Sequence, residues 1–332
     1  AVVANHVECD ELVLLNGKLA GARLYDRIAG NWLEVFASTV VNATGAWSAS
    51  TVARLLGASR VAAARLWREI RIVTPAIAAT HALAFPEEDG DDLTIVPWRG
   101  MSVVGTALEA FEREPDDTAA EADDVAWLAE RAGRLVPAAR DALSSPVDGF
   151  ATLRILPRTP ERRRHLPHGG SLVDHAGDGM AGLLSVGGGE WTTIRPLAER
   201  VVDRIVAITA RTARPCDTAV APLSETVDAD PGVFAVEWSR AYPYWPDGEI
   251  AAWASAYGAA LPDVIARAGE AYRPSDAARE AARFAYARDE EMAVLPDDFA
   301  RRLSRWYELS RPGVAIRAAE WLAGRAGPAD PA

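Results

Sequence analysis

Cysteine and lysine are almost absent from this sequence. Its 332 residues include two cysteines, Cys9 and Cys216, which are far apart and in no CxxC spacing. Two distant cysteines cannot build a disulfide framework or a thiolate metal site, and their scarcity is typical of a reducing compartment, so we expect a cytoplasmic protein. Lys18 is the single lysine. Together with the abundant alanine this indicates coding bias, and no function follows from it.

Long hydrophobic runs and positive charge are also missing. No apolar run reaches the ~18–20 residues that a membrane-spanning helix needs. The formal net charge is −12 at pH 7, which argues against a nucleic-acid groove or an anionic membrane surface as the main partner. His165, His168 and His175 lie within eleven residues, but no HExxH motif or carboxylate at ligand spacing accompanies them. They predict a polar loop and no metal site.

The pattern of the chain changes once along its length. A single core usually stops growing near ~250–300 residues, so 332 residues favour two domains. Residues 1–213 hold short β-like runs with helical segments between them, and residues 214–231 form a linker rich in Pro and Asp. Residues 232–332 hold several helical patterns and almost no strand. The sequence therefore predicts an α/β (α+β) fold followed by an all-helical C-terminal domain.

Local patterns predict three further segments. Residues 49–69 have helical or irregularly helical character, and residues 116–137 have apolar side chains at helical spacing. Residues 157–182, rich in Arg, His, Pro and Gly, predict a long loop. That loop contains GDGMAG, a formal match to GxGxxG. A dinucleotide fingerprint needs a strand before it and a helix after it, so this match is interpreted as a turn.

Two other segments have the context that GDGMAG lacks. In SVGGGEWTT (185–193) a strand ends in three glycines, and a helix is expected to begin near Thr192 and Thr193, whose hydroxyls can cap it. Glycine allows a ligand to approach the backbone closely, and the free N–H groups of a helix start favour an electron-rich ligand edge. VVNATG (40–45) is a second strand that ends in a turn of small residues.

These two segments, in this order, resemble FAD-dependent glycerol-3-phosphate dehydrogenases of the D-amino-acid-oxidase-like flavoprotein superfamily. Three runs between them resemble strands of that family's substrate domain: IRIVTPAIAATHALAFP, LTIVPWRGMSVVGTA and FATLRILP. The later run EAARFAYARDEEMAVLPDDFARRL resembles the family's C-terminal cap. The resemblance implies that residues 1–213 are the remainder of an FAD-binding domain plus an antiparallel substrate-binding sheet, with residues 232–332 as the cap.

The resemblance implies FAD as the cofactor and a small molecule as the substrate. It implies that the flavin contacts lie at these positions: Val7, Ala43, Thr44, Gly45, Trp47, Gly188, Gly189, Glu190, Trp191, Thr192 and Thr193. His81 matches the family's active-site histidine, which can accept the hydroxyl proton as hydride leaves carbon. Arg154 matches the arginine that holds the substrate's anionic group, and Thr106 matches the first Thr of the family's Gly-Thr-Thr-Asp turn. The resemblance implies that Thr106, Arg154 and Glu190 bind the substrate. A core histidine and a surface arginine are the alternative interpretations of His81 and Arg154.

Several positions depart from the family pattern, and most departures concern charge. The signature Lys is replaced by Glu190, a second Lys by Ala78, and the Thr-Asp pair by Ala107 and Leu108. A carboxylate several Å from a dianionic phosphate repels it by roughly 1–4 kcal/mol at effective dielectric constants of 80–20. We therefore expect a neutral or cationic substrate, or a monoanionic carboxylate held by Arg154. A relative of the amino-acid or hydroxy-acid oxidases and a degenerate, non-catalytic binding module are the alternatives.

The family's N-terminal strand-GxGxxG-helix has no counterpart in this sequence. We therefore expect the chain to be the C-terminal part of a larger flavoprotein or one half of a split one, with an upstream FAD-binding segment or chain as its partner. The resemblance also implies a quinone electron acceptor at the membrane surface, hence a peripheral membrane position, and a homodimer. No nucleic-acid partner is expected.

Overall fold

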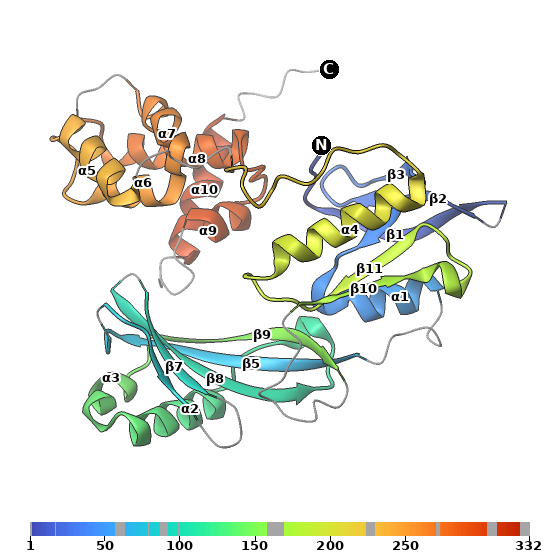
Figure 1. The fold of residues 1–332 in the computed structure, drawn as a ribbon. Coiled ribbons are helices and arrows are strands. Elements are labelled where there is room, and N and C mark those ends of the chain that lie inside the picture. Colours follow the sequence, from blue (N-terminus) through green and yellow to red (C-terminus); the bar gives the residue numbers. More distant parts are fainter. Residues whose placement is uncertain are drawn as a thin grey trace. The chain divides into compact units, whose positions relative to one another are not determined.

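The computed structural model of the protein contains three β-sheets followed by a series of helices (Figure 1). It describes residues 2–16, 18–56, 64–78, 80–86, 92–98, 100–157, 169–223, 230–269, 273–303 and 311–325. The chain forms two compact units, His6–Cys216 and Asp217–Ala332, the latter together with Ala1–Asn5. The fold class expected from the sequence is confirmed.

The first sheet is an antiparallel meander in the order β1 (Val7–Leu15), β2 (Lys18–Asp26) and β3 (Asn31–Phe36). Every residue of β3 is exposed, including the large apolar side chains of Trp32 and Phe36. This edge strand therefore owes its position to backbone pairing with β2 and not to burial of its side chains.

The second sheet carries the segments that resemble flavin-contacting strands. Its order is β10 (Ser171–Asp174), β11 (Leu183–Gly187) and β4 (Val40–Asn42), with β4 parallel to β11. Helix α4 (Ile194–Thr209) covers one face, and the short helices η1 (Gly45–Trp47) and α1 (Ser48–Leu56) lie on the other (Figure 1). The carboxyl ends of β4 and β11 therefore meet at one edge of the sheet, where a ligand can reach both following turns.

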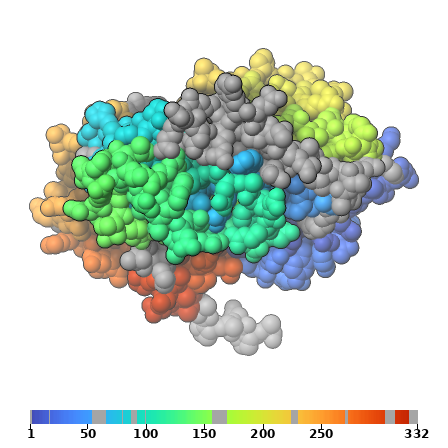
Figure 2. Space-filling model, turned by 90° about the horizontal axis from the view of Figure 1, so that it is seen from below, coloured from blue at the N-terminus to red at the C-terminus, as the bar shows by residue number. Residues whose placement is uncertain are grey.

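The third sheet has five strands in the order β6-β7-β8-β5-β9, all antiparallel. The bounds are β5 Ala64–Pro75, β6 Leu83–Phe85, β7 Leu93–Trp98, β8 Met101–Phe111 and β9 Asp148–Pro157. Its lower face packs on α2 (Ala122–Leu135) and α3 (Arg140–Leu143), with Ile70, Ile72 and Leu128 in the shared core. In Figure 2 the green surface of α2 and α3 lies beside the teal surface of β8. Two short 3₁₀ helices, η3 (Pro115–Asp117) and η4 (Pro137–Ala139), flank α2.

Two local predictions for this unit are wrong. Residues 64–69, expected to be helical, begin β5, because both of its edges pair with strands that lie far away in sequence. The expected loop 157–182 contains β10 and the 3₁₀ helix η6 (His175–Asp178), which are held by pairing with β11. His165 and His168 fall outside the described residues. The helix expected within 116–137 is confirmed, and GDGMAG lies in the turn before β11.

The second unit is helical throughout its described part. Its bounds are α5 Pro231–Ala241, α6 Glu249–Tyr257, η7 Gly258–Ala260, α7 Leu261–Arg267, α8 Asp276–Asp289, α9 Pro296–Leu303 and α10 Arg311–Arg325. One core gathers around Trp245, Trp253 and Tyr257, and another around Phe284 and Phe299. Among the described helices of the whole chain, none is long and apolar enough to cross a membrane.

Candidate active site

The turn that follows β4 is held in place by the side chain of Asn42. Asn42 is 5% exposed, and its Nδ2 donates to the carbonyl and hydroxyl oxygens of Ser48 at 3.2 Å. Its Oδ1 accepts from the hydroxyl of Thr44 at 2.7 Å and from the backbone N–H of Thr44 at 3.3 Å. The three residues Ala43, Thr44 and Gly45 are consequently exposed on a fixed backbone. A sequence-predicted contact surface for the flavin thus rests on a buried amide.

Two further buried polar residues, Ser185 and His175, hold the side chain of Asn42 through hydrogen bonds. Ser185 of β11 is 7% exposed and His175 is 4% exposed. His175 Nδ1 lies 2.8 Å from Asp178 Oδ2, and its Nε2 lies 2.9 Å from Ser185 Oγ. Since the carboxylate accepts from Nδ1–H, the hydroxyl of Ser185 donates to Nε2 and is left to accept from Asn42 Nδ2, at 3.4 Å. The prediction of a polar loop at His175 is therefore wrong: the ring is a buried member of a hydrogen-bonded chain.

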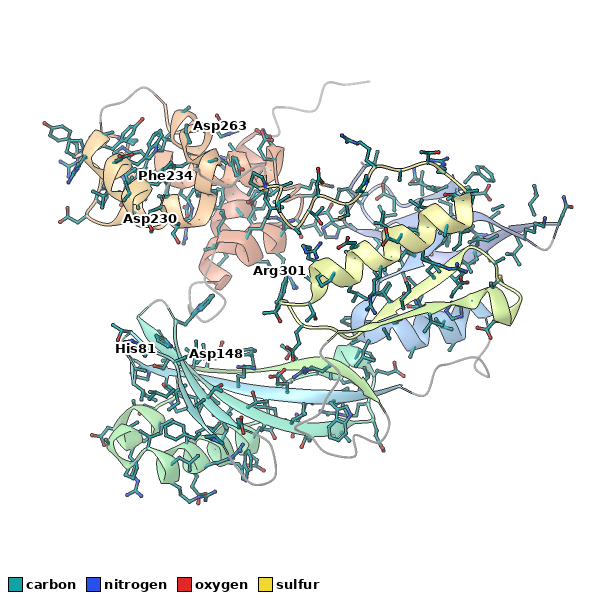
Figure 3. All side chains as sticks on the ribbon, in the orientation of Figure 1. His81, Asp148, Asp230, Phe234, Asp263 and Arg301 are labelled. Carbon is teal, nitrogen blue, oxygen red and sulfur yellow. The ribbon has the colours of Figure 1, made fainter. Side chains whose placement is uncertain are left out.

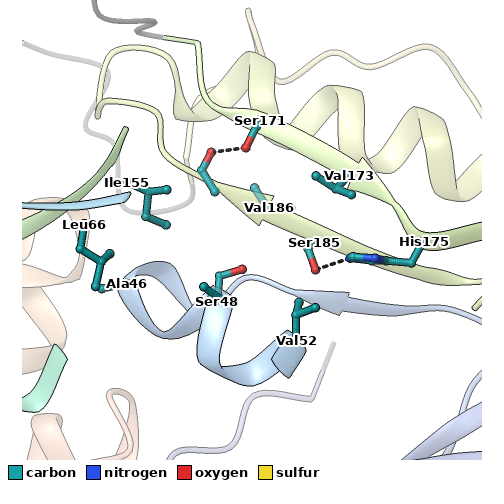
Figure 4. A pocket seen from close by; sticks show the side chains of 12 residues that line it. Ala46, Ser48, Val52, Leu66, Ile155, Ser171, Val173, His175, Ser185 and Val186 are labelled. Atoms are coloured by element: carbon teal, nitrogen blue, oxygen red, sulfur yellow. Dashed lines mark hydrogen bonds between the residues drawn. The ribbon is translucent and has the colours of Figure 1, made fainter. Parts of the chain in front are cut away.

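An apolar cavity of about 90 Å³ lies beside this chain of hydrogen bonds. Figure 4 shows Val52 and Ala46 on one side and Val173 and Val186 on the other, with the bond between Ser185 and His175 at one end. The apolar lining screens the hydrogen-bonded groups from water, which strengthens their interaction and makes the loss of any member costly. The network is a support for the turn after β4.

The end of β11 supplies the second turn. Gly188 and Gly189 have φ values of +69° and +90°, which few side-chain-bearing residues adopt. A Cβ at Gly188 would lie 3.2 Å from the carbonyl oxygen of Ile155. Helix α4 begins at Ile194, and Thr193, its N-cap, makes no side-chain capping bond. The capping role expected of the threonine hydroxyls is therefore wrong for Thr193, whose Oγ1 bonds to the backbone of Glu190.

The two turns and β9 enclose a cavity of about 140 Å³ lined by Gly45, Ala46, Leu153, Arg154, Ile155, Gly188 and Gly189. Gly45 has a φ of +56°, and no atom lies within 4 Å of the place where its Cβ would be. A flat ring can therefore approach the backbone at Gly45 as closely as at the two other glycines. The first N–H groups of α4 lack a side-chain acceptor and favour an electron-rich edge. These residues fit the edge of a flavin ring.

The cavity wall carries one ion pair, between two of the residues predicted to bind substrate. Arg154 Nη2 donates to Glu190 Oε1 at 2.8 Å, and the two side chains are 26% and 34% exposed. No other N–H of this guanidinium has a partner among the residues that the structure describes. The glutamate that replaces the family's Lys therefore partly neutralises Arg154, which keeps donors for one further anionic group.

The upper face of the five-stranded sheet carries a second ion pair, which the sequence did not reveal. Glu69 Oε1 accepts from Arg71 Nη2 at 2.5 Å and from the hydroxyl of Thr106 at 3.2 Å. Thr106 is among the residues predicted to bind substrate, whereas no sequence motif marks Glu69 or Arg71. Their signal is the local alternation Glu69-Ile70-Arg71-Ile72, in which the two charged residues share one face of the strand and the two isoleucines the other. Asn42 and Ser185 are similar single polar residues within apolar runs.

Other predicted residues lie elsewhere. His81 is exposed on the loop before β6 and bonds to the hydroxyl of Thr80 at 2.8 Å. Figure 3 shows it at the end of the sheet where Asp148 begins β9. Through the pairing of β6 with β7, β8 and β5, Leu83 lies level with Ile72 of β5. Ile72 is five residues along β5 from Trp67, which pairs with Arg154 of β9. At ~3.3 Å per residue this is about 16 Å, so the register does not bring His81 to Arg154.

The remaining predicted flavin contacts divide into two groups. Trp47, Trp191 and Thr192 follow the two turns and are exposed, Trp191 by 92%. Val7 begins β1 in the meander, opposite Asp26, and lines neither turn. No group of three or more metal-ligating side chains occurs in the described part of the chain.

Known proteins are similar to this chain over the part that contains this site. The family model described as FAD dependent oxidoreductase, DAO, matches residues 6–203. The glycerol-3-phosphate dehydrogenase of Synechocystis sp. is 31% identical over 130 residues, which make up 39% of this chain and 24% of that protein. The D-erythritol 1-phosphate dehydrogenase of Brucella abortus is 26% identical over 238 residues, covering 70% of this chain and 47% of that protein.

One solved structure has a similar fold over almost the whole chain. The glycerol-3-phosphate dehydrogenase from Bacillus halodurans, solved in complex with FAD, superimposes with a TM-score of 0.79 at 22% identity. The match covers 97% of this chain and 64% of that one. This chain therefore spans less than two thirds of the relatives that it matches.

Proposed function

The chain belongs to the DAO family of FAD-dependent oxidoreductases, and from this we propose that it forms the substrate-binding part of an enzyme that oxidises a small hydroxyl- or amine-bearing molecule. The resemblance to glycerol-3-phosphate dehydrogenases seen in the sequence motifs is confirmed by the relatives. FAD is the family's cofactor, and the glycines of the two turns fit its ring edge.

FAD, when bound, would supply the hydride acceptor for this oxidation. The chain's own residues have three tasks in this proposal. Gly45, Gly188 and Gly189 let the ring approach the backbone, and the network of Asn42, Ser185 and His175 keeps the first turn in place. Arg154 orients the substrate through an anionic group. His81 has no task in this proposal, because the register places it about 16 Å from Arg154 along the sheet, too far to accept a proton from a small molecule held there.

The observation that carries the choice of substrate is the ion pair between Arg154 and Glu190 at 2.8 Å. A guanidinium that already shares one carboxylate binds a monoanion well, whereas a dianionic phosphate is repelled by the neighbouring glutamate. The proposal is therefore a small molecule with one carboxylate or none. Glycerol 3-phosphate is not the favoured substrate.

A further segment or chain completes the FAD site in this proposal. The chain corresponds to 64% of the FAD-bound structure, and β3 exposes an apolar surface of the kind that another part of a protein covers. The quinone acceptor, the homodimer and the peripheral membrane position stay predictions from the resemblance, and the cytoplasmic location stays a prediction from the scarcity of cysteine.

Anaerobic reduction of the flavin tests the proposal on the full-length protein purified with its FAD. We expect the visible flavin band to bleach on addition of a small hydroxy acid or amino acid, and less readily with glycerol 3-phosphate. Arg154→Ala should slow bleaching at least about 10-fold, since one charge-assisted interaction is lost. Arg195→Ala is the matched control, because Arg195 pairs with Glu199 on the neighbouring helix at 2.8 Å.

A second candidate function is a binding module without catalysis, which the exposed position of His81 and the loss of the signature Lys favour. The two candidates differ in one result. If dithionite bleaches the flavin but none of the small substrates does, the oxidoreductase is rejected and the binding module remains.

A further inference from the structure

Two ion pairs lie next to each other on the upper face of the five-stranded sheet. Trp67 of β5 is directly opposite Arg154 of β9, so both side chains are on the same face. Glu69 follows Trp67 by two residues and therefore shares that face. Glu69 and Arg154 are thus diagonal cross-strand neighbours, which places their backbones about 7–8 Å apart. Arg71 and Glu190, the ionic partners of these two residues, extend the row at either end.

Glu69 is the most buried charge in this row. The residue is 8% exposed, and its two hydrogen-bond donors, Arg71 and Thr106, both use the single oxygen Oε1. Oε2 accepts no hydrogen bond from the residues that the structure describes. Oε2 is not among the buried side-chain atoms left without a partner, so it is open to a donor from a ligand or from water.

The surroundings hold the carboxylate in this position. The stem of Arg71 lies against Gly105: a Cβ there would be 2.7 Å from Arg71 Cγ. Glycine at this place lets Arg71 lie flat on the sheet and reach Glu69. Because Thr106 donates its only hydroxyl proton to Glu69, its oxygen can act only as an acceptor toward a further group. Glu69 and Thr106 therefore offer acceptors, while Arg154 offers donors.

We infer that Glu69 is the specificity-determining residue of the substrate site and binds the amino group of a small amino acid whose carboxylate lies on Arg154. This inference rests on the proposed function. The amino and carboxylate groups of an α-amino acid are held by one carbon, so a ligand of this class spans two diagonal neighbours on one sheet face. The ammonium group gains a charge-assisted bond at Oε2, which a hydroxyl group in the same place does not match in strength.

The row of charges also disfavours the alternatives. Arg154 has a carboxylate on each side, Glu190 and Glu69, so a phosphate dianion would face two like charges at close range. A neutral polyol would leave the free donors of Arg154 without an anionic partner. A zwitterionic amino acid places its ammonium group on Glu69 and its carboxylate on Arg154 within one small molecule.

Binding of two unreactive ligands tests this assignment independently of catalysis. 2-Aminoisobutyrate and 2-hydroxyisobutyrate have the same carbon skeleton and no hydrogen on the α-carbon, so the enzyme cannot remove hydride from either. With the FAD-loaded full-length protein we expect calorimetric titration to show at least about 10-fold tighter binding of the amino compound. Glu69→Gln should abolish this preference by weakening the amino compound about 10- to 100-fold, with under about 3-fold change for the hydroxy compound.

Two further variants keep the test decisive. Glu11→Gln is the control, because Glu11 is also a strand glutamate paired with an arginine, Arg23, at 3.0 Å. Glu11→Gln should leave both affinities unchanged. Glu69→Asp retains the charge and shortens the side chain, so it should bind the amino compound more weakly than wild type even where Glu69→Gln fails to fold.

The outcomes separate this inference from the proposed function. Equal affinity of the two compounds for wild type, or an unchanged preference in Glu69→Gln and Glu69→Asp, overturns the inference. Flavin bleaching by hydroxy acids and not by amino acids also overturns it while the oxidoreductase stands. Conversely, a clear amino preference without bleaching by any substrate supports the subsite and rejects catalysis.

Discussion

Arginines on the upper face of the five-stranded sheet are used differently from those in the aromatic core of the helical unit. On the upper sheet face, Arg71 and Arg154 each make one ion pair with the residues that the structure describes, and each keeps further donors toward them. In the helical unit, arginines lie over aromatic rings: Arg279 over Trp245 and Arg283 over Trp253, at 5.7 and 6.0 Å from the ring centroids. Cations that stack on rings fill space and stabilise packing. Arg71 and Arg154 therefore have donors for a ligand, whereas Arg279 and Arg283 contribute to packing.

The helical unit owes its stability to a run of touching aromatic rings. Trp245 and Trp253 meet edge to face at 5.0 Å, Trp253 and Tyr257 at 6.1 Å, and Tyr257 and Tyr286 at 5.3 Å. Such pairs add to the burial of large apolar surfaces. The sheet unit instead buries polar groups at the turn after β4. A substitution in each unit should therefore have a different kind of effect.

The largest effect is expected at the centre of the aromatic run. Trp253→Ala should lower the free energy of unfolding of the helical unit by about 3–5 kcal/mol, because it removes a buried ring and leaves a cavity. Urea unfolding followed by far-ultraviolet circular dichroism measures this loss. Trp191→Ala is the control: Trp191 is 92% exposed, and its removal should change stability by less than about 0.5 kcal/mol. Equal losses from both would contradict the packing role.

A smaller loss of stability, together with weaker FAD binding, is expected when the hydrogen-bonded network under the turn after β4 is broken. Ser185→Ala leaves His175 Nε2 without its hydroxyl donor and Asn42 with one acceptor fewer, which should cost about 1–3 kcal/mol. FAD affinity, measured by quenching of flavin fluorescence, should fall as well, because the turn at Gly45 loses its support. Ser171→Ala is the control, since the exposed Ser171 donates to the carbonyl of Gly187 at 3.1 Å. Weaker FAD binding in the control alone would remove the positioning role from Ser185.

The two turns could be read from sequence, whereas their supports could not. Gly188 and Gly189 could be identified from the sequence, because three glycines after a strand indicate a turn that needs backbone freedom. Asn42 and His175 are 133 positions apart in the chain, and they are connected through Ser185 only once β4 pairs with β11. The pairing of strands far apart in sequence also explains why residues 64–69 form β5, since local alanine and leucine spacing favours a helix there.

The row of charges on the upper sheet face depends on register in the same way. Glu69 and Arg154 are 85 positions apart and become neighbours because Trp67 pairs with Arg154. A register shifted by one residue would place them on opposite faces. The resemblance identified Arg154 and Thr106 by motif, but no motif marks Glu69, whose role depends on which residues share its face.

A still smaller effect is expected from the charge of Asp174, at the start of η6. The backbone N–H of Ala176, and then Arg204, lower the pKa of Asp174. Its ionised form therefore stabilises the folded state above the unfolded pKa of about 3.9, and this contribution is lost as the pH falls through the lower folded value. Asp174→Asn should cost about 0.2–1 kcal/mol at neutral pH, with the difference shrinking in acid. Urea unfolding midpoints of the wild type and of Asp174→Asn, at neutral and at acidic pH, measure this cost. If the two proteins differed by the same amount at both pH values, the ionic contribution would be rejected.

The smallest effect, with the opposite sign, is expected at Glu291 in the helical unit. Burial raises the pKa of Glu291, although Arg302 and Arg283 partly offset it. The folded state therefore favours the protonated form: the contribution is present below the unfolded pKa of about 4.3 and is lost as the pH rises through the higher folded value. Glu291→Gln keeps the shape without the charge, so it should stabilise the unit by about 0.5 kcal/mol at neutral pH and have no effect in acid. Glu290→Gln is the control, because Glu290 is exposed and paired with Arg267 at 2.8 Å, and its loss should be neutral or slightly destabilising. A destabilising Glu291→Gln at neutral pH would mean that attraction by the two arginines outweighs burial, and ionisation would then stabilise the helical unit as it does the sheet unit.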